Sequence, residues 1–222
     1  MVLVLWDIDG TLVDTAGHGR HAFQEAFEAV MGRQPEPVEF AGRTDHQIAL
    51  AMLDHDREAL PRLLEELAAA LETRKEAMRR DGHAYPGVPE TLAALHRRDG
   101  VVQSLLTGNI EPNAALKVGA FGLERWLEFD VGAYGSDPHE ERSELVAVAR
   151  ERVRAKYGEP TSAVLVGDTP HDVQAARDAG ARAVAVATGF SNPDALRASR
   201  PDVLLDDLSD TAAAVKAIVG SG

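Results

Sequence analysis

The chain begins with an apolar run that leads directly into two aspartates. Residues 2–6 read Val-Leu-Val-Leu-Trp, which is typical of a buried strand. Asp7 and Asp9 follow it on alternate positions, and Gly10 then allows the backbone to turn away. Open α/β folds bind ligands at the carboxyl ends of parallel strands. The opening segment therefore predicts two carboxylates in a binding crevice, where their repulsion favours a bound cation or a retained proton.

Strand-like and helix-like segments alternate in the second part of the chain. The strand-like segments are residues 101–106, 129–132, 163–166, 183–187 and 203–205. The helix-like segments are residues 86–98, 112–118, 143–157, 172–179 and 209–219. This alternation predicts an α/β fold with a doubly wound parallel sheet and helices on both of its faces.

The segment between the first strand and this alternating part has helical patterns only. Apolar spacing predicts helices over residues 18–31, 48–53 and 60–78, and no strand-like run interrupts them. We therefore expect residues 16–82 to form an inserted helical domain. Residues 1–15 and 83–222 should together form the core domain.

Composition and charge exclude several classes of function. The chain has 222 residues with 23 basic and 36 acidic side chains, and its net charge of −13 disfavours binding to nucleic acid or anionic membranes. There is no cysteine, which excludes disulfides, thiolate metal sites and cysteine nucleophiles. No apolar run has the length of a membrane span, and the first is too short for a signal peptide. We expect a cytoplasmic monomer or homodimer.

Three of the predicted strands end in polar residues at what should be one edge of the sheet. The first strand gives Asp7 and Asp9, the second leads into Thr107-Gly108-Asn109, and a later one gives Asp168, with Asp172 four residues on. Because the carboxyl ends of parallel strands share one crevice, these carboxylates should converge. Oxygen ligands of this kind suit Mg²⁺, which often accompanies a substrate phosphate.

These segments resemble the motifs of a known family. Residues 7–12, Asp-Ile-Asp-Gly-Thr-Leu, resemble the first motif of the phosphatase branch of the haloacid dehalogenase superfamily. Residues 106–109 resemble its second motif and residues 167–172 its fourth, in the same order along the chain. The helical segment 16–82 resembles the family's inserted cap on a Rossmann-like core. The nearest branches are similar to phosphoglycolate phosphatase and β-phosphoglucomutase.

The resemblance implies a role for each aspartate. Asp7 would attack phosphorus and form an aspartyl-phosphate, and Asp9 would protonate the leaving oxygen and later deprotonate water. A halide leaves without a proton, so an aspartate at position 9 favours phosphoryl transfer over dehalogenation. Asp7, Asp9, Asp168 and Asp172 would hold Mg²⁺, the expected cofactor.

The resemblance also implies a phosphate-binding group. Thr107 would contact the transferring phosphoryl group and count among the catalytic residues, and Gly10, Gly108 and Asn109 would help to bind the substrate.

The sequence departs from the family pattern at one position. The family's third motif supplies a lysine that bridges the nucleophile and the phosphate, whereas the start of the corresponding helix here carries Arg142. Arg142 is the first candidate for this catalytic role, and Lys117 on the preceding helix is the second. An arginine would present a planar fork in place of a point charge.

Residues 42–45, Gly-Arg-Thr-Asp, resemble the cap loop that reaches over the substrate in relatives acting on phosphoglycolate. In that interpretation Arg43 binds a substrate carboxylate or phosphate. The alternative is an ordinary helix start capped by Thr44 or Asp45. The expected partner is a small soluble phosphate ester, with phosphoglycolate as the leading candidate.

Two alternatives to a phosphatase stay open at this point. A sugar phosphomutase of the same fold would use the same aspartates to pass phosphate to a sugar hydroxyl. A non-catalytic binding protein could use a degenerate version of the fold, although such a protein would be expected to lack one of the motif aspartates.

Overall fold

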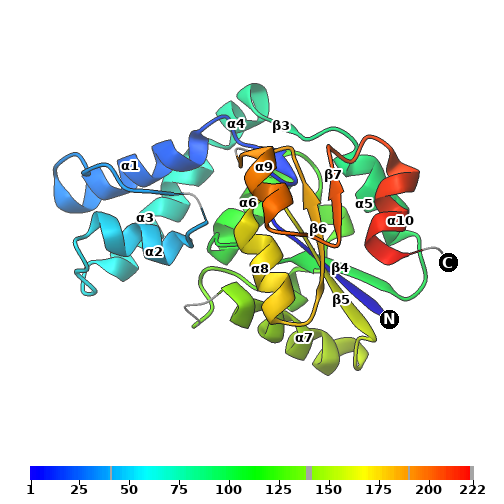
Figure 1. Cartoon of the computed structure of the whole chain (residues 1–222). Coiled ribbons are helices and arrows are strands. Elements are labelled where there is room, and N and C mark those ends of the chain that lie inside the picture. The colour runs from blue at the N-terminus through cyan, green and yellow to red at the C-terminus, as the bar shows by residue number, and fades with distance from the viewer. Residues whose placement is uncertain (41, 139–141, 190, 221–222) are drawn as a thin grey trace.

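A computed structural model of the chain describes residues 1–40, 42–138, 142–189 and 191–220. Its centre is a parallel sheet of five strands in the order β4-β1-β5-β6-β7 (Figure 1). The strands are β1 (Val2–Trp6), β4 (Val101–Leu105), β5 (Ser162–Gly167), β6 (Arg182–Val186) and β7 (Val203–Leu205). The predicted doubly wound α/β fold is confirmed.

The register of the three central strands places the motif residues side by side. Trp6, the last residue of β1, is paired with Leu105 on one side and with Val166 on the other. The strands therefore end at nearly the same level, and the polar residues that follow them lie at one edge of the sheet. The strand β4 lies on one side of β1 and the later strand β5 lies on the other, so the strand order reverses at β1. This is the topology that opens a ligand crevice in α/β folds.

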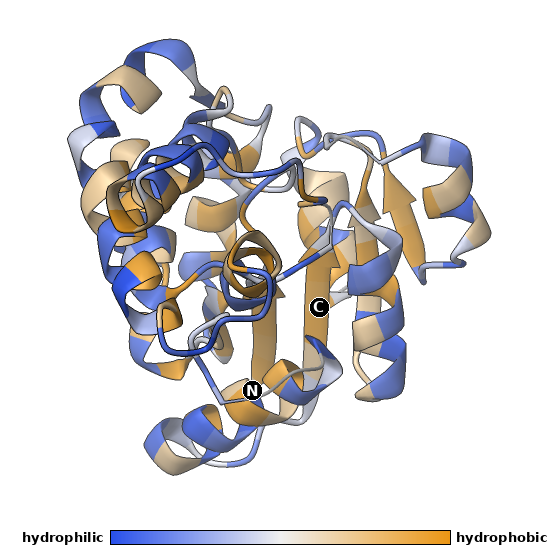
Figure 2. Ribbon diagram, turned by 90° about the vertical axis from the view of Figure 1, so that its left-hand side faces the viewer, coloured by the Kyte–Doolittle hydropathy of each residue, from blue (hydrophilic) through white to orange (hydrophobic). Residues whose placement is uncertain are grey.

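Helices cover both faces of the sheet. One face packs against α5 (Val88–His96), α6 (Glu111–Ala120) and α10 (Thr211–Val219), and the other against α7 (Arg142–Tyr157), α8 (Pro170–Asp178) and α9 (Pro193–Ala198). Along β1, Val4 and Trp6 belong to the first core, and Leu3 and Leu5 belong to the second. Figure 2 shows the strands as the most hydrophobic elements, enclosed between helices with polar outer faces. Apolar side chains on both faces explain why these strands read as continuous apolar runs.

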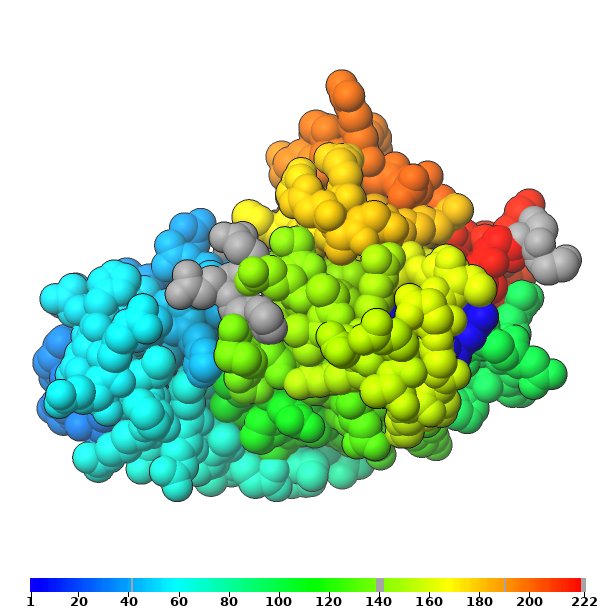
Figure 3. Space-filling view, turned by 90° about the horizontal axis from the view of Figure 1, so that it is seen from below, coloured from blue at the N-terminus to red at the C-terminus, as the bar shows by residue number. Residues whose placement is uncertain are grey.

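The helical segment has a core of its own. It contains α1 (His18–Met31), α2 (Asp45–Met52), α3 (Leu60–Thr73) and α4 (Lys75–Asp81), and α1 to α3 lie together at one side of the sheet (Figure 1). Phe27, Ile48 and Leu67 are among the buried residues that hold them together. Seen from below, these helices form one end of the molecule and adjoin the core body (Figure 3).

A short antiparallel pair closes the two ends of this segment. Strands β2 (Val13–Asp14) and β3 (His83–Ala84) pair with each other, which the sequence did not predict. The chain therefore leaves the core and returns to it at adjacent points. We propose that residues 16–82 form a cap domain and that residues 1–15 and 83–222 form the core domain.

Two predicted elements differ from the structure. The helix predicted over residues 60–78 is divided at Arg74, which lies between α3 and α4. The Arg74 guanidinium pairs there with Glu25 of α1. The strand predicted over residues 129–132 is wrong: Phe129–Val131 is a 3-10 turn. The Tyr134 and Ser104 hydroxyls donate to the carbonyls of Phe129 and Glu128, and so bind acceptors that a strand would use in a ladder.

In the part of the chain that the structure describes, no helix combines the length and the apolar character needed to cross a membrane.

Candidate active site

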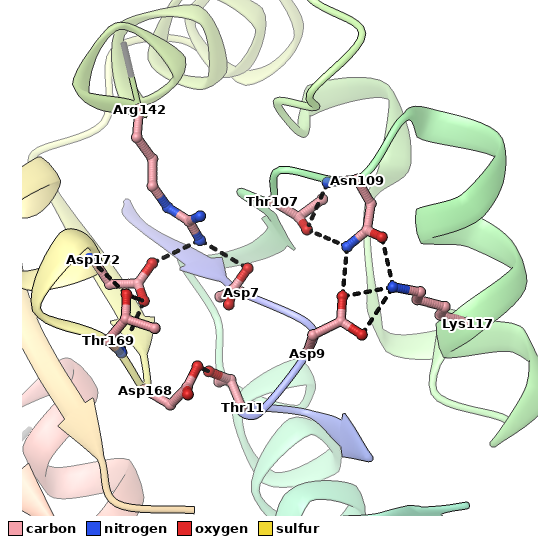
Figure 4. Close-up of polar contacts among 10 residues, drawn as sticks. All are labelled: Asp7, Asp9, Thr11, Thr107, Asn109, Lys117, Arg142, Asp168, Thr169 and Asp172. Atoms are coloured by element: carbon pink, nitrogen blue, oxygen red, sulfur yellow. Dashed lines mark hydrogen bonds and ion pairs between the residues drawn. The ribbon is translucent and has the colours of Figure 1, made fainter. Parts of the chain in front are cut away.

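Polar side chains from three strand ends meet in one cavity beneath the helical segment. Its volume is about 490 Å³. The core contributes Asp7, Asp9 and Asp168 to its lining, and the helical segment contributes Arg43 and Asp45. The side chains form two groups, one around Asp7 and the other around Asp9 (Figure 4). This arrangement separates the two aspartates that the first motif delivers.

The first group contains three buried carboxylates. Asp7, Asp168 and Asp172 each offer an oxygen, and these atoms all lie within 4.8 Å of one another. Burial raises the pKa of Asp7 and of Asp168, and the neighbouring carboxylates raise both further. Ionised together, these groups need a positive charge among them. A set of buried carboxylate oxygens that repel one another fits a hard divalent cation.

Arg142 is the cation that the structure places in this group. One guanidinium nitrogen lies 2.8 Å from Asp7 Oδ1 and 2.7 Å from Asp172 Oδ1. The two carboxylates raise the pKa of Arg142 above its usual value, although burial opposes them. Its Nε is buried and has no hydrogen-bond partner among the described residues. Arg142 thus pairs with the predicted nucleophile, and its Nε takes no part in that pairing.

Asp172 owes its orientation to the start of α8. Thr169 precedes the helix as its N-cap, and the Thr169 backbone N–H and hydroxyl both donate to Asp172 Oδ2, at 3.1 and 2.6 Å. Such a reciprocal cap fixes the first turn of a helix. The other carboxylate oxygen of Asp172 is left to face Arg142 and Asp7.

The second group is built around Asp9. Lys117 Nζ donates to Asp9 Oδ1 and Oδ2 at 2.8 and 2.6 Å, and Asn109 Nδ2 donates to Oδ2 at 2.8 Å. Lys117 was the second candidate for the cation beside the nucleophile, but the structure pairs it with Asp9 and pairs Arg142 with Asp7. The Asp9 carboxylate consequently faces away from the other three acids, and it is not a member of the oxygen cluster around Asp7.

Thr107 and Gly108, which follow β4, line the cavity together with the groups around Asp7 and Asp9. The Thr107 hydroxyl oxygen is buried and accepts from the backbone N–H and the side-chain amide of Asn109, at 3.2 and 2.8 Å. Gly108 carries no side chain at a point where a Cβ would lie 2.8 Å from the backbone oxygen of Arg43. Glycine at this position therefore allows the loop of the helical segment to approach the strand end.

That loop, residues 42–45, combines both roles considered from the sequence. Thr44 is the N-cap of α2 and forms a capping box with Gln47. Arg43 is exposed and lines the cavity, with its guanidinium 3.6 Å from a Glu39 carboxylate oxygen. The loop therefore starts helix α2 and also places Arg43 in the lining of the cavity.

Asp45 attaches the loop to the core. Its backbone N–H donates to Gly108 O at 2.7 Å, and its carboxylate accepts the backbone N–H of Ile110 at 2.9 Å. Burial raises the pKa of Asp45 to about 6. The sequence alone predicts for Asp45 only a capping role at its own helix. The bond to the start of α6 joins residues 65 positions apart, and no local pattern announces it.

Gly10 supports this geometry through its backbone conformation. Its φ is +85°, and an added Cβ would lie 2.5 Å from Asp168 Oδ2. We expect Gly10→Ala to displace Asp168 and to lower kcat/KM at least about tenfold, in addition to a strain of roughly 1–2 kcal/mol. Gly180→Ala is the matched control, because Gly180 also has a positive φ but no atom lies within 4 Å of a Cβ added there. An equal loss of activity in both variants, measured as phosphate release, would contradict this role of Gly10.

Comparison with known proteins identifies the family. A model of haloacid dehalogenase-like hydrolases matches residues 1–180. The chain belongs to this family. The hydrolase is 31% identical over 98% of its length to "Probable phosphatase IndB" of Dickeya dadantii, covering 94% of that protein. It is 32% identical over 94% of its length to phosphoglycolate phosphatase 1 of Pseudomonas aeruginosa, covering 77% of that protein.

The fold agrees with that of a solved structure. A hydrolase from Pseudomonas syringae superposes with a TM-score of 0.70 over 97% of this chain and 98% of that one, at 20% identity. Family membership and relatives named as phosphatases make this hydrolase a phosphatase.

Proposed function

We propose that the protein is a Mg²⁺-dependent phosphomonoester hydrolase that works through an aspartyl-phosphate on Asp7. The observation that carries this proposal is the placement of Asp7. Its carboxylate is buried at the end of the central strand, contacts Arg142, and lies in an oxygen cluster with Asp168 and Asp172. A nucleophilic carboxylate held beside positive charge is suited to meet an anionic phosphate.

The proposed reaction has two steps. A carboxylate oxygen of Asp7 attacks phosphorus, the bond from phosphorus to the ester oxygen breaks, and Asp9 transfers a proton to the leaving oxygen. Asp9 then takes a proton from a water molecule, which attacks the phosphorus of the acyl phosphate. Inorganic phosphate leaves, and the Asp7 carboxylate is restored.

Asp7, Asp168 and Asp172 would hold the metal. When bound, Mg²⁺ supplies the positive charge that lets an anionic substrate approach the carboxylates. Asp9 was the fourth expected ligand, but its carboxylate faces Lys117, so the proposal assigns its side chain to proton transfer alone. Thr107, Gly108 and the Arg142 guanidinium would contact the phosphoryl oxygens. Asn109 was also expected to bind the substrate, but its N–H groups donate to Thr107 and Asp9.

Phosphoglycolate is the substrate that we propose first. Arg43 lines the same cavity from the helical segment and could pair with the glycolate carboxylate. The Pseudomonas aeruginosa relative named phosphoglycolate phosphatase 1 supports this choice. A sugar phosphomutase would use the same aspartates, and interconversion of sugar phosphate isomers would distinguish it from a phosphatase.

Phosphate release from a panel of esters, with Mg²⁺ or with a chelator, tests the proposal. We expect the chelator to lower the rate at least about 100-fold, since the metal contributes several kcal/mol. Arg43→Ala should raise KM for phosphoglycolate about tenfold, the cost of one charged hydrogen bond, and should change KM for p-nitrophenyl phosphate less than about threefold.

Three results would revise this function. A wild-type protein that hydrolyses phosphoglycolate poorly within the panel would contradict the substrate. Interconversion of sugar phosphate isomers without net phosphate release would favour the mutase. Rates equal in Mg²⁺ and in chelator would contradict the metal requirement.

A further inference from the structure

The hydrolase carries a buried lysine that the proposed reaction does not use. We propose that Lys117 is a positioning residue which, together with Asn109, fixes the Asp9 carboxylate for its work at the leaving-group oxygen. This inference rests on the proposed function. It assigns to Lys117 no contact with the substrate.

The contacts form a closed network. Lys117 Nζ donates to both carboxylate oxygens of Asp9 and to Asn109 Oδ1, the last at 2.6 Å. Asn109 Nδ2 in turn donates to Asp9 Oδ2 and to Thr107 Oγ1, both at 2.8 Å. The network therefore joins the end of β1, the end of β4 and helix α6, as Figure 4 shows.

The donor count indicates positioning and not substrate binding. An ammonium group has three N–H donors, and Lys117 has three acceptors within hydrogen-bond distance. None of its donors is left for a substrate oxygen. Arg142 differs in this respect, because its buried Nε has no hydrogen-bond partner among the described residues.

Burial gives the network its rigidity. Lys117 is only 6% exposed, whereas the side chain of Asp9 is 46% exposed. An exposed aspartate on a turn is free to change rotamer, and a buried lysine paired with it restricts that freedom. The pair costs desolvation of the lysine, so it is weak evidence for stability and better evidence for a role in geometry.

Helix α1 of the helical segment lies against the Lys117 ammonium group. Gly19 lies in the first turn of α1, and a Cβ added there would be 3.4 Å from Lys117 Nζ. The glycine lets the α1 backbone lie close over the ammonium group. Lys117 is thus enclosed between the core helix α6 and α1, at the edge of the cavity nearest Asp9.

The test compares two aryl esters of nearly the same shape. Phenyl phosphate has a poor leaving group that needs a proton, and p-nitrophenyl phosphate has a more acidic one that does not. Release of the phenol in the first turnover is followed by rapid mixing, so that hydrolysis of the phosphoenzyme does not mask it. We expect Lys117→Met to slow phenyl phosphate at least about tenfold more than p-nitrophenyl phosphate, with KM changed less than about threefold.

A double-mutant cycle shows whether Lys117 acts through Asp9. On an Asp9→Asn background, Lys117→Met should change the rate less than about twofold, because residues that act as a unit are non-additive. Lys117→Arg should restore part of the phenyl phosphate rate, since it returns a cation to Asp9. Lys216→Met, which removes an exposed lysine of α10, should leave both rates unchanged.

The possible results distinguish failure of the Lys117 proposal from failure of the proposed phosphatase function. A large rise in KM with unchanged kcat would make Lys117 a substrate-binding residue and overturn the proposal. Equal losses with both esters, or full additivity with Asp9→Asn, would also overturn it. If Lys117→Met does not fold, Lys117→Arg takes its place in the comparison. A folded Lys117→Arg protein that loses the same fraction of its rate with both esters would overturn the proposal. A wild-type protein that releases phosphate from neither ester would refute the proposed function itself, and the proposal with it.

Discussion

Asp7→Asn is expected to abolish phosphate release, with kcat lowered at least about 10⁴-fold. The amide has nearly the same shape as the carboxylate and can keep its oxygen beside Arg142, whose guanidinium lies 2.8 Å from Asp7 Oδ1 in the wild-type protein. It cannot form an acyl phosphate, so the reaction loses its covalent step. Phosphate release from p-nitrophenyl phosphate with Mg²⁺ measures the loss.

Two further measurements make this prediction specific. Rapid quenching and mass spectrometry should detect a phosphorylated wild-type protein during turnover and none in the variant. Asp99→Asn serves as the matched control, because Asp99 is exposed and precedes β4 at the opposite end of the sheet. A variant that retains more than about a hundredth of the wild-type rate would show that another group attacks phosphorus.

The second large effect is a reversal of stability at Asp168. Its carboxylate is buried, and the hydrogen bond it accepts from the Thr11 hydroxyl is 3.2 Å long. Without metal, Asp168→Asn should raise the melting temperature at neutral and alkaline pH, because it removes a buried charge. A gain of about 1–3 kcal/mol corresponds to roughly 2–10 °C for a chain of this size.

The dependence on pH follows from the direction of the pKa shift. In the unfolded chain Asp168 loses its proton near 3.8, whereas burial and the neighbouring acids raise its pKa in the folded protein. Over the interval between the two values the unfolded state binds fewer protons, so the free energy of unfolding falls as pH rises. The stability gain from Asp168→Asn should therefore vanish below about pH 4 and reach its full size above the folded pKa.

Magnesium should reverse the order of the two proteins. A ligand at 1,000 times its dissociation constant stabilises the folded state by about 4.1 kcal/mol, which exceeds the gain expected from Asp168→Asn, and the variant lacks one of the proposed metal ligands. Melting curves in chelator and in Mg²⁺ test this directly. If the wild-type protein were the more stable of the two in both conditions, Asp168 would not be a destabilised carboxylate that a cation relieves.

Much of the fold follows from local patterns in the sequence. Apolar strands followed by Asp7, Thr107 and Asp168 predict both the sheet and the shared edge, because parallel register alone brings strand ends together. The 129–132 strand was mispredicted because the local sequence does not reveal that two side-chain hydroxyls bind the carbonyls of Glu128 and Phe129.

The site contains pairings that no local pattern carries. Lys117 contacts Asp9 across 108 residues, so its choice between the two aspartates depends on where α6 lies relative to the sheet. The sequence could propose Arg142 or Lys117 for one role. Only the three-dimensional arrangement assigns one cation to each aspartate.

The β2–β3 pair has a consequence for how such enzymes can diversify. Because Val13 is paired with Ala84 and Asp14 with His83, the insertion points of the helical segment are neighbours in space. Neighbouring strands lie roughly 5 Å apart, so a segment of another length or design needs only ends with that separation. Grafting one contiguous stretch would exchange the helical segment over the cavity, while the sheet and the aspartates at its edge stay intact.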